Sequence, residues 1–519
     1  MTSPAHPSIP PQPGSAPAPR LHTGDATLDR AFQLALDDIG SNIAPYQLGL
    51  LEQPAPVLLA GRDYPDPWTR DAAINTWNGA GLLHPEVMRN TLLAVLKRGT
   101  HGPVITDDKE FNYWDIIIWA IGGWWHYLYT GDREFLQLAF TATRNTLTLF
   151  EETEFDAVTG LFRGAASYGD GDSAYPDRYA QPGGTGGIRD WVRLHPELAA
   201  TPGGGLPMQA LSTNCIYHHV YQLLGEMAAE LGVPPDPAWS TKAAALKTAI
   251  NQRLWMPEAG RYRYFIDPFG GCDQHEGLGH AFALLFNVAA PSQAAAVLTH
   301  QHVTPWGIPC LWPSFDRYAK PDGMSFGRHA GTVWPHIQAF WADAALRHGR
   351  ADRFEFELRQ LATLAVTYGE FREIYHPVTG EPYGGEQQGL EIWGHKCWES
   401  CHRQTWSATG YLRMVLMGLC GMEFTPTGIR FAPHLPAGLE GLALTGLPYR
   451  RMTMNITIKG TGANPGTCTI NGRRMPEPFL AADGDGIHDI VIERTTHQSR
   501  ERSATLGRES DRARRKTES

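Results

Sequence analysis

The sequence predicts a mainly α-helical chain, an (α/α)6 toroid of six helical hairpins followed by a small C-terminal β-sandwich domain. Between about residues 25 and 420, an amphipathic helix, a loop rich in Gly, Pro and aromatic residues, and another helix follow one another repeatedly. About twelve helices are expected there, which is too many for a simple bundle and fits six hairpins closed into a ring. Near residue 424 the pattern changes to short β-rich runs separated by Gly and Pro.

Sequence signals indicate where these helices begin and end. Apolar residues recur at helical spacing in GDREFLQLAFTATRNTLTLF after a cap at Asp132, and the helix in VWPHIQAFWADAALRHG stops at Gly349. Helices are expected to begin near Ala26, Asp71, Pro85, Tyr113, Arg133, Met208, Ser240, Glu276, Pro291, Thr332, Ala351 and Gln404. The longest loops, 167–191 and 369–403, are long for a compact domain, which usually indicates function.

Four regions follow from these patterns. Residues 1–24 are rich in Pro, Ala and Ser and lack the apolar stretch of a secretion signal, so a disordered leader is expected. Residues 25–423 form the expected helical domain. Residues 424–494 form the expected β-sandwich, with an Asn-Gly hairpin turn at 471–472. Residues 495–519 are charged and poor in hydrophobic residues, which predicts a disordered, solvated tail.

Composition excludes several classes of protein. Hydrophobic residues make up 42% of the 519 residues, enough for a sizeable core, and a net charge of −10 argues against a nucleic-acid partner. The seven cysteines are scattered, so no disulfide framework is expected, and no apolar run is long enough to span a membrane. We therefore expect a cytoplasmic protein of undetermined oligomeric state. The 16 Trp suit a site that stacks sugar rings, although a large helical core also uses bulky residues.

Several stretches combine polar and aromatic residues beside helix starts. In DYPDPWTRDAAINTW, Arg70 and Asp71 open a helix after a proline-rich approach. An adjacent Arg and Asp offer the donors and acceptors that neighbouring sugar hydroxyls require, although a helix N-terminal charge with a surface Arg gives the same pattern. In FNYWDIIIWAIGGWWHYLYTGD, Trp114 and Asp115 near the helix start are site candidates, and most other Trp residues there are assigned to the core.

A third stretch, ASYGDGDSAYPDRY, carries two acidic residues in a Gly-rich turn. A Gly-flanked acid at Asp170 or Asp172 can approach a ligand closely, and one desolvated by Tyr could hold its proton near neutral pH. An ordinary Asx turn is the alternative. A calcium loop is disfavoured because the Glu that an EF-hand requires is missing.

Two further stretches complete a candidate site. The fourth, SFGRHAGTVWPHIQAFW, sets Arg328 before Trp334 at a helix start. The fifth, FREIYHPVTGEPYGG, places Glu373 two residues before Tyr375 at the mouth of a glycine-rich loop, and HRQTWSATGYLRM follows it. A carboxylate here and an acid of the third stretch, with opposite protonation states, would be the minimum machinery for cleaving a glycosidic bond.

One loop raises the question of a metal. HKCWESCH, residues 395–402, contains two His and two Cys, at positions 397 and 401. The spacing is not the usual C-x2-C and no second pair of ligands is evident, so free cysteines are the favoured interpretation and no metal is expected. Whether this loop binds a metal is left open.

The order of PWTRDAA, an acidic loop, GTVWPH, EIYHPVTGEPYGG and QTWSATGYL resembles that in the six-hairpin (α/α)6-barrel glycoside hydrolases, over roughly residues 45–435. E-x-Y-x-P-x-T-G followed by a Trp-Ser pair looks most like the glucosidase I and trehalase branch. W-x-R-D-A-A is similar to the glucoamylase motif. The trehalase signature Gln-Trp-Asp-Tyr-Pro-Asn is missing, so trehalose is not the expected substrate.

The resemblance implies roles for individual residues. Glu373 would be the general base. The acid would be an Asp, for which Asp172 fits best and Asp170 is close behind. Motifs and resemblance together give the expected substrate-binding residues Trp68, Arg70, Asp71, Trp114, Asp115, Arg328, Trp334, Tyr375, Gln404 and Trp406.

The expected function is that of an inverting, exo-acting glycosidase without a cofactor, acting on a small α-glucoside or related oligosaccharide. An α-L-rhamnosidase-type glycosidase and a glycoside phosphorylase on the same barrel are the alternatives. A sugar epimerase or a non-catalytic carbohydrate-binding protein is less favoured. The sequence leaves open the identity, linkage and anomeric configuration of the sugar.

Overall fold

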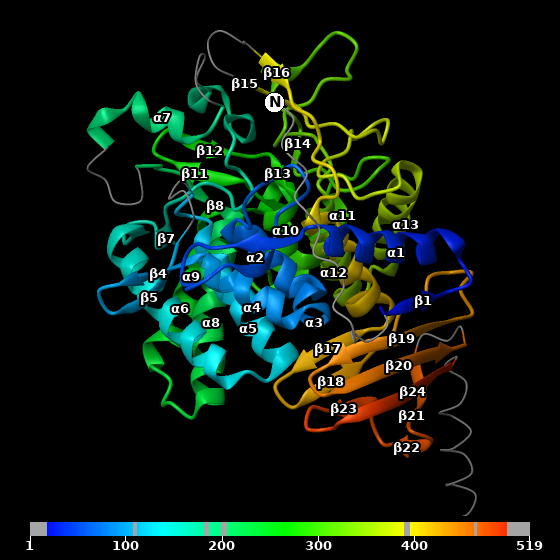
Figure 1. Ribbon diagram of the computed structural model, residues 1–519. Coiled ribbons are helices and arrows are strands. Elements are labelled where there is room, and N and C mark those ends of the chain that lie inside the picture. The colour runs from blue at the N-terminus through cyan, green and yellow to red at the C-terminus, as the bar shows by residue number, and fades with distance from the viewer. Residues whose placement is uncertain are drawn as a thin grey trace, which may run out of the picture. The chain divides into compact units, whose positions relative to one another are not determined.

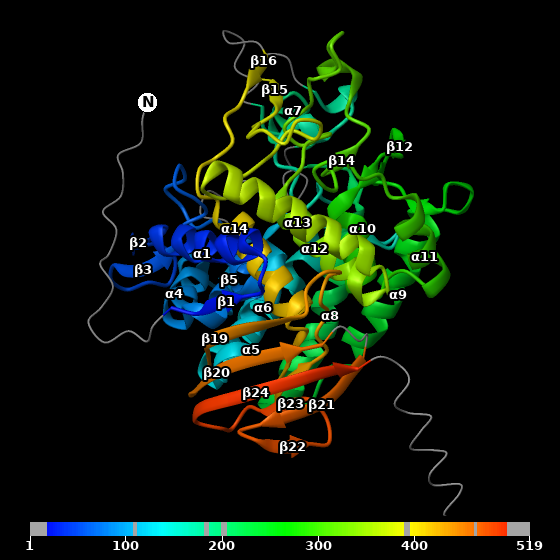
Figure 2. The ribbon, with the colours of Figure 1, turned by 90° about the vertical axis from the view of Figure 1, so that its right-hand side faces the viewer.

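The computed structural model describes residues 18–106, 112–180, 186–198, 205–388, 395–460 and 464–495. The chain is rich in helices, carries additional sheets and divides into two compact units. The first unit contains Arg30–Met414, and the second contains the described parts of Gly14–Asp29 and Val415–Ser519. Figures 1 and 2 show the helices of the first unit and the strands of the second.

Six helices of the first unit pack against one another in a closed series. Helix α2 packs on α5, α5 on α8, α8 on α10, α10 on α12, α12 on α14, and α14 again on α2. Further helices flank this series: α4 packs on α5, α6 on α5 and α8, α9 on α8, α11 on α10, and α13 on α12. The bounds are Thr69–Asn75 (α2), Pro85–Ala94 (α4), Trp119–Thr130 (α5), Arg133–Thr153 (α6), Leu211–Leu231 (α8), Pro237–Arg253 (α9), Gly277–Leu285 (α10), Pro291–His300 (α11), Pro335–Arg347 (α12), Ala351–Tyr368 (α13) and Thr405–Arg413 (α14).

Local signals account for many helix starts. The predicted starts are confirmed at the first residues of α1 (Ala26–Ser41), α4, α6, α11 and α13. Asp132 caps α6 by accepting a hydrogen bond of 2.9 Å from the backbone N–H of Phe135. A proline occupies the first turn of α4 and of α11, where its missing N–H breaks no helical hydrogen bond.

The helix predicted from Tyr113 begins later than expected. A 3-10 turn at Ile116–Ile118 precedes α5. The side chain of Asp115 pairs with Arg70, which lies on another helix, so contacts with a distant segment compete with helix formation at this point. The predicted start is therefore wrong, for a reason that local sequence does not contain.

The loops of the first unit contain short β-ladders, although almost no strands were predicted there. They are too short to show the alternation of apolar and polar residues that identifies a strand in a sequence. The ladders pair β2 (Ile43–Tyr46) with β3 (Ala55–Leu58), β4 (Leu96–Gly99) with β5 (Gly102–Ile105), β6 (Phe155–Asp156) with β7 (Leu161–Phe162), β9 (Trp255–Met256) with β10 (Arg261–Tyr262), β11 (Phe265–Asp267) with β8 (Gln209–Ala210) and β12 (Gly270–Cys272), β13 (His275–Glu276) with β14 (Leu311–Trp312), and β15 (Glu386–Gln388) with β16 (His395–Cys397).

The second unit contains a six-stranded sheet and a three-stranded sheet. The larger sheet has the order β1-β19-β20-β24-β21-β22, and the smaller one the order β17-β18-β23. Strand β20 runs parallel to β24, and the other neighbours are antiparallel. The bounds are Arg20–His22 (β1), Met422–Thr425 (β17), Gly428–Phe431 (β18), Gly441–Tyr449 (β19), Met452–Lys459 (β20), Asn464–Ile470 (β21), Arg473–Met475 (β22), Phe479–Ala481 (β23) and Gly486–Thr495 (β24).

The strands of this unit follow from the sequence pattern. Buried and less buried residues alternate along β20, so one face of the sheet is apolar. The predicted Asn-Gly turn is confirmed between β21 and β22: Asn471 and Gly472 both adopt positive φ angles, 51° and 74°, as a tight hairpin turn requires. Packing of the two sheets as a sandwich stays a prediction.

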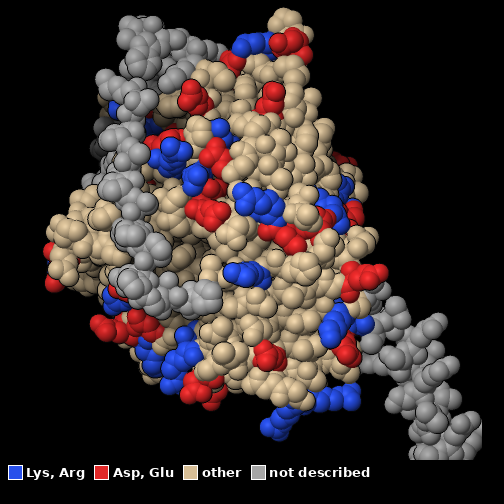
Figure 3. All heavy atoms as spheres, turned by 45° about the vertical axis from the view of Figure 1, so that its right-hand side comes forward, with Lys and Arg blue, Asp and Glu red and all other residues tan. Residues whose placement is uncertain are grey.

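The ends of the chain differ in part from the predicted regions. Arg20–His22, inside the predicted leader, form strand β1 on the edge of the larger sheet. The rest of the leader up to residue 17 and the tail from residue 496 lie outside the described residues. None of the helices in the described ranges combines the length and apolar character of a membrane span. On the face in Figure 3, basic and acidic side chains are interspersed.

Candidate active site

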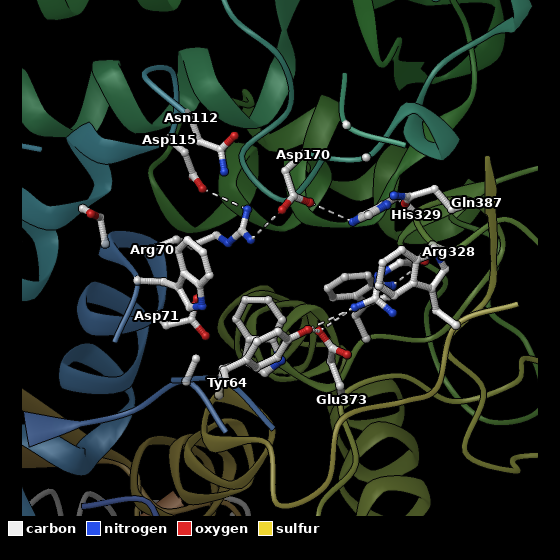
Figure 4. Close-up of a pocket in the computed structure, with 18 of the residues that line it drawn as sticks. Tyr64, Arg70, Asp71, Asn112, Asp115, Asp170, Arg328, His329, Glu373 and Gln387 are labelled. Carbon is white, nitrogen blue, oxygen red and sulfur yellow. Dashed lines mark hydrogen bonds and ion pairs between the residues drawn. The ribbon is translucent and has the colours of Figure 1, made fainter. Parts of the chain in front are cut away.

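A cavity of about 510 Å³ opens among the long loops of the first unit (Figure 4). Most of the predicted site residues line this cavity, namely Trp68, Arg70, Asp71, Asp115, Asp170, Arg328, Trp334, Glu373, Gln404 and Trp406. Three of them are N-cap residues of helices in the closed series: Trp68 of α2, Trp334 of α12 and Gln404 of α14. The sequence motifs therefore coincide with the points where these helices begin.

Glu373 lies on one side of the cavity, in the loop after α13. Its Oε1 accepts hydrogen bonds of 2.8 Å from the hydroxyl of Tyr64 and from Nη2 of Arg328. Its Oε2 accepts a third, of 3.3 Å, from the backbone N–H of Cys401. The side chain is 3% exposed. Three converging donors fix the direction of the carboxylate and compensate for its burial.

Arg328 is held as firmly as the carboxylate that it binds. Its guanidinium lies over the rings of Trp334 and Trp398, at 5.6 and 5.8 Å from their centroids. Its Nη1 donates a hydrogen bond of 3.0 Å to the carbonyl of Gly384. Burial favours the neutral form of Arg328, but the charge of Glu373, the hydrogen bond to it and the charge of Asp170 together raise the pKa, so the side chain stays cationic.

Asp170 lies across the cavity from Glu373, between Arg70 and His329 (Figure 4). Its Oδ1 is 3.0 Å from Nε2 of His329, and its Oδ2 is 4.0 Å from Nη2 of Arg70. The side chain is 42% exposed. Burial tends to raise the pKa of Asp170, but the hydrogen bond with His329 and the charges of Arg70 and Arg328 bring it well below its usual range.

Arg70 joins two walls of the cavity. Its Nη1 is 2.9 Å from Oδ2 of Asp115 and donates a hydrogen bond of 2.6 Å to the carbonyl of Ser167. Its guanidinium lies 5.3 Å from the ring centroid of Trp406. Asp115 is fixed in turn, because its Oδ1 accepts a hydrogen bond of 2.7 Å from the hydroxyl of Ser167. Arg70 is therefore a rigid donor that balances the acidic side chains around it.

Asp71 is a deeply enclosed carboxyl group of the cavity wall, at 2% residue exposure. Burial raises its pKa well above the usual value; Arg70 opposes this, and the charges of Glu373, Asp115 and Asp170 add to it. Within the described part of the chain, no partner lies within hydrogen-bond distance of Oδ1. A protonated carboxyl group at this point offers both a donor and an acceptor to a ligand hydroxyl.

Gln404 and Trp68 also line the cavity. Both side-chain amide atoms of Gln404 are buried and lack a hydrogen-bond partner among the described residues. The backbone of Trp68 has φ 47°, in the left-handed region that residues other than glycine seldom adopt. Such backbone strain, of order 1 kcal/mol, concentrates at functional sites.

Three predicted residues do not line the cavity. Asp172 is 1% exposed and opens a 3-10 turn whose backbone N–H donates to the carbonyl of Gly186. Trp114 is fully buried and donates its indole N–H to a backbone carbonyl. Tyr375 is fully buried, and its hydroxyl accepts a hydrogen bond from the backbone N–H of Arg372. All three take part in the folding of the loops that carry the lining residues.

Several lining residues were not singled out from the sequence. Tyr64 belongs to the same stretch as Arg70 and could have been found there. His329 adjoins Arg328 and was not selected. Gln387, in β15, and Trp398, just after β16, also line the cavity. They carry no local signal because β15 is held there by backbone hydrogen bonds between Glu386 and the distant residues Phe326 and Arg328. Asn112, Arg189, Asp190 and Arg193 line the cavity as well.

Cys397 and Cys401 do not form a joint site in the described structure. Cys397 is exposed and Cys401 is buried, and both are free thiols. The thiol of Cys401 donates to the carbonyl of His402. In the described ranges, no group of three or more His, Cys, Asp or Glu side chains has the arrangement of a metal site.

Solved structures share the fold at low sequence identity. A GH63 mannosylglycerate hydrolase from Thermus thermophilus, in complex with glucose, matches 74% of this chain and 99% of its own, with a TM-score of 0.56 and 15% identity. A GH78 rhamnosidase of Bacillus sp. GL1 matches 92% of this chain and 44% of its own, with a TM-score of 0.57 and 14% identity. A sialidase matches 90% of this chain and 41% of its own, with a TM-score of 0.63 and 14% identity.

The chain thus spans less than half of the rhamnosidase and of the sialidase. No curated protein sequence matches it. The profile of a family of glycoside hydrolases matches residues 64–390, which include both Asp170 and Glu373. By that match over more than half of its length, the chain belongs to the mannosylglycerate hydrolase MGH1-like glycoside hydrolase family.

Proposed function

We propose that the chain is a glycoside hydrolase that cleaves a small glycoside from its non-reducing end with inversion of configuration. The observation that carries the proposal is the placement of Asp170 and Glu373 on opposite sides of one cavity (Figure 4). Two carboxyl groups that flank the scissile bond are the machinery that most glycosidases use. Membership of a glycoside hydrolase family supports the same class of reaction.

Asp170 is the proposed general acid and Glu373 the proposed general base. The neighbours of Asp170 favour its ionised form, so it acts in its minor, protonated form: it gives its proton to the glycosidic oxygen as the bond between that oxygen and the anomeric carbon breaks. Glu373 takes a proton from a water molecule whose oxygen bonds to the anomeric carbon on the opposite face. We prefer Asp170 to Asp172 because Asp170 lines the cavity and Asp172 does not.

The surroundings of Glu373 suit a base. Tyr64 and Arg328 both donate to Oε1, so Oε2, which accepts only a long hydrogen bond from a backbone N–H, is the oxygen available to orient water. Burial raises the pKa of Tyr64 well above its usual value and the charge of Glu373 adds to this, so its hydroxyl keeps the proton that it donates.

The terminal sugar is proposed to lie against Asp71, Arg70 and Gln404. A protonated carboxyl, a guanidinium and an amide together offer the mixed donors and acceptors that a ring of hydroxyls requires. The indoles of Trp334 and Trp406, with ring centroids 5.6 Å apart, supply apolar surface for the C–H face of the ring. A cavity of this size holds a small ligand, which supports exo-action.

The closed series of helices supports the predicted toroid. We propose that α2, α5, α8, α10, α12 and α14 form its inner ring and that the flanking helices form the outer one. The N-caps of three inner helices would then lie at one end of the ring, where the long loops gather. The β-rich second unit is proposed to be the predicted sandwich.

The substrate class follows from the relatives. The predicted small α-glucoside remains the first candidate, the rhamnosidase among the fold relatives supports the rhamnoside alternative, and the mannosylglycerate hydrolase adds mannosylglycerate. A panel for a test therefore contains α-glucosides, α-mannosides including mannosylglycerate, α-L-rhamnosides and short disaccharides.

The test is sugar release from this panel by the wild type, Glu373→Gln and Asp170→Asn, with and without added phosphate. We expect phosphate-independent release by the wild type and a loss of at least about 10³-fold in kcat/KM for both variants. Glu381→Gln, an exposed residue of the same loop, is the control and should retain activity. Turnover that requires phosphate would identify a phosphorylase, and release that survives in Glu373→Gln would refute the assigned base.

A further inference from the structure

A chain of hydrogen bonds runs behind the carboxyl group of Asp170. Nε2 of His329 is 3.0 Å from Oδ1 of Asp170, and Nδ1 of His329 is 3.0 Å from the hydroxyl of Ser173. The same hydroxyl accepts a hydrogen bond of 3.2 Å from the backbone N–H of His329 and lies 3.3 Å from Oε1 of Gln387. Both nitrogens of the imidazole therefore have a partner.

The packing leaves this imidazole little freedom. His329 is 2% exposed and Ser173 is fully buried. The ring of Trp334 lies 5.0 Å from the imidazole, centroid to centroid, and that of Tyr168 lies 6.3 Å away. A Cβ atom on Gly171 would lie 2.6 Å from the imidazole, so glycine is required at that position for the ring to be where it is.

The protonation state of the imidazole follows from its neighbours. Burial lowers the pKa of His329, Arg328 and Arg70 lower it further, and only Asp170 raises it. The ring is therefore neutral near pH 7. An ionised Asp170 only accepts hydrogen bonds, so the hydrogen of the ring lies on Nε2 and points at Oδ1 of Asp170. The hydroxyl of Ser173 then gives its one hydrogen to Nδ1, at 3.0 Å, rather than to Oε1 of Gln387, at 3.3 Å.

We propose that His329 is a positioning residue for the general acid. It donates from Nε2 to Oδ1 of Asp170, which fixes the carboxyl group and leaves Oδ2 to carry the proton that the glycosidic oxygen receives. Ser173 sets the tautomer. The inference rests on the proposed function, since it assigns to His329 an effect on that same acid.

A nucleophilic role for the serine does not fit this geometry. A Ser–His–Asp arrangement acts in acyl transfer when the serine faces the substrate. Ser173 is fully buried and is not among the residues that line the cavity. The contacts therefore run from the buried Ser173 through His329 to the partly exposed Asp170. Asp170 is the group in this chain that can reach a substrate.

The pH profile distinguishes this role from a merely structural one. The titratable and charged groups that face Asp170 are the neutral imidazole of His329 and the guanidinium groups of Arg70 and Arg328. The N–H of His329 stabilises the carboxylate, so its removal raises the pKa of Asp170. A general acid works while it is protonated, and the alkaline limb of kcat/KM therefore moves to higher pH when His329 is replaced.

The leaving group gives a second readout. Fluoride leaves with little help from a proton, whereas an alkoxide needs the acid. The probes are α-D-glucosyl and α-D-mannosyl fluoride beside oxygen-linked glycosides of the same sugars. We expect His329→Leu to lose about 10²-fold in kcat/KM on oxygen-linked substrates and much less on the fluorides. His329→Gln, which can still place an N–H near Oδ1, should restore part of the loss.

His280→Leu is the matched control. His280 is also fully buried and has partners at both nitrogens, Gln301 at 2.5 Å and the carbonyl of Tyr262 at 3.1 Å, but it does not line the cavity. Its replacement should lower the midpoint of thermal unfolding without moving the alkaline limb. Equal losses of His329→Leu on both kinds of substrate, with an unchanged pH profile, would overturn the proposal.

A measurement on the wild type does not depend on any variant folding. Nitrogen-15 NMR of labelled histidine reports the tautomer of His329 at pH 7, and we expect a neutral ring with hydrogen on Nε2. A ring with hydrogen on Nδ1 alone, or on both nitrogens, would overturn the proposal. Failure of the wild type to cleave any glycoside would instead overturn the proposed function, so the two failures are distinguishable.

Discussion

At the scale of single residues, four of the five carboxyl groups that line the cavity differ because their neighbours differ. Asp115 is paired with Arg70, Glu373 with Arg328, and Asp170 stands between His329 and the guanidinium groups. Asp71 and Glu373 are both 2% exposed. The pKa of Asp71 is raised well above the usual value, whereas that of Asp170 is lowered. Environment, rather than residue type, therefore sets which of these two carboxyl groups holds its proton.

Arg328→Lys tests the support of the base. A lysine cannot bond Gly384 and Glu373 at once in a planar fork, nor stack between two indoles. We expect kcat/KM to fall by about 10²-fold while circular dichroism shows a folded protein. Arg372→Lys, a change of the same kind in the same loop but outside the cavity, should have little effect. Equal activities of the two variants would contradict this role of Arg328.

Asp71→Asn and Asp115→Asn test the two protonation states. The pKa of Asp71 is raised in the folded chain, so the folded state loses stability as pH rises above the pKa of the unfolded carboxyl group, near 4. The amide of Asp71→Asn does not ionise, so this variant should be as stable as the wild type at pH 8, or more stable. Asp115→Asn leaves the charge of Arg70 without its partner and should cost about 3 kcal/mol. The midpoints of thermal unfolding of both variants, measured at pH 5 and pH 8 beside the wild type, test these two expectations. A larger loss for Asp71→Asn at pH 8 would be inconsistent with a protonated Asp71.

At the scale of elements, the site is built where helices begin. The motifs W-x-R-D, T-V-W-P-H and Q-T-W-S each contain the N-cap and first turn of a helix: α2, α12 and α14. Caps and prolines are local signals, so the sequence could predict these positions. The choice between Asp170 and Asp172 could not be predicted, because it depends on a hydrogen bond from the turn to Gly186, in another part of the same loop.

Gly171→Ala tests how the acidic turn packs. Gly171 has an ordinary φ of −92°, so an alanine meets no backbone strain there. Its Cβ would lie 2.2 Å from Oε1 of Gln387 and 2.6 Å from the ring of His329, which must then move. We expect a loss of about tenfold or more in kcat/KM with the fold retained. Gly40→Ala, which has open space around its Cβ, is the control. Full activity of Gly171→Ala would show that the position of His329 does not matter.

At the scale of the whole molecule, the sequence predicted the alternation of helices and long loops and the change to β-strands near residue 424. It did not predict the short ladders of the first unit, whose strands of two to four residues are too brief for periodicity. Nor could it predict Gln387 and Trp398, because the hairpin that carries them is held at the cavity by hydrogen bonds between Glu386 and the distant residues Phe326 and Arg328. Local propensity explains the elements, and such long-range contacts explain the rest of the site.

Buried acids away from the cavity should govern the pH dependence of global stability. Burial raises the pKa of Glu276 to about 8, although the backbone N–H of Ser212 opposes the shift. The unfolded carboxyl group ionises near pH 4.5, so the folded chain binds more protons between these values and stability falls as pH rises through them.

We therefore expect Glu276→Gln to raise the midpoint of thermal unfolding at pH 8 and to change it little at pH 4.5. Differential scanning calorimetry across this range measures the effect. The same variant of Glu258, which is exposed, provides the baseline. A parallel pH dependence of Glu276→Gln and the wild type would exclude Glu276 as the cause.

The central claim is that Asp170 and Glu373 act as acid and base on opposite sides of a bound glycoside. Proton NMR of the reaction in its first minutes, before the anomers equilibrate, tests it most directly. We expect the wild type to release the sugar with inverted configuration, and Glu373→Gln to release none. Release with retained configuration would mean that one carboxylate is a nucleophile and would contradict the assigned roles.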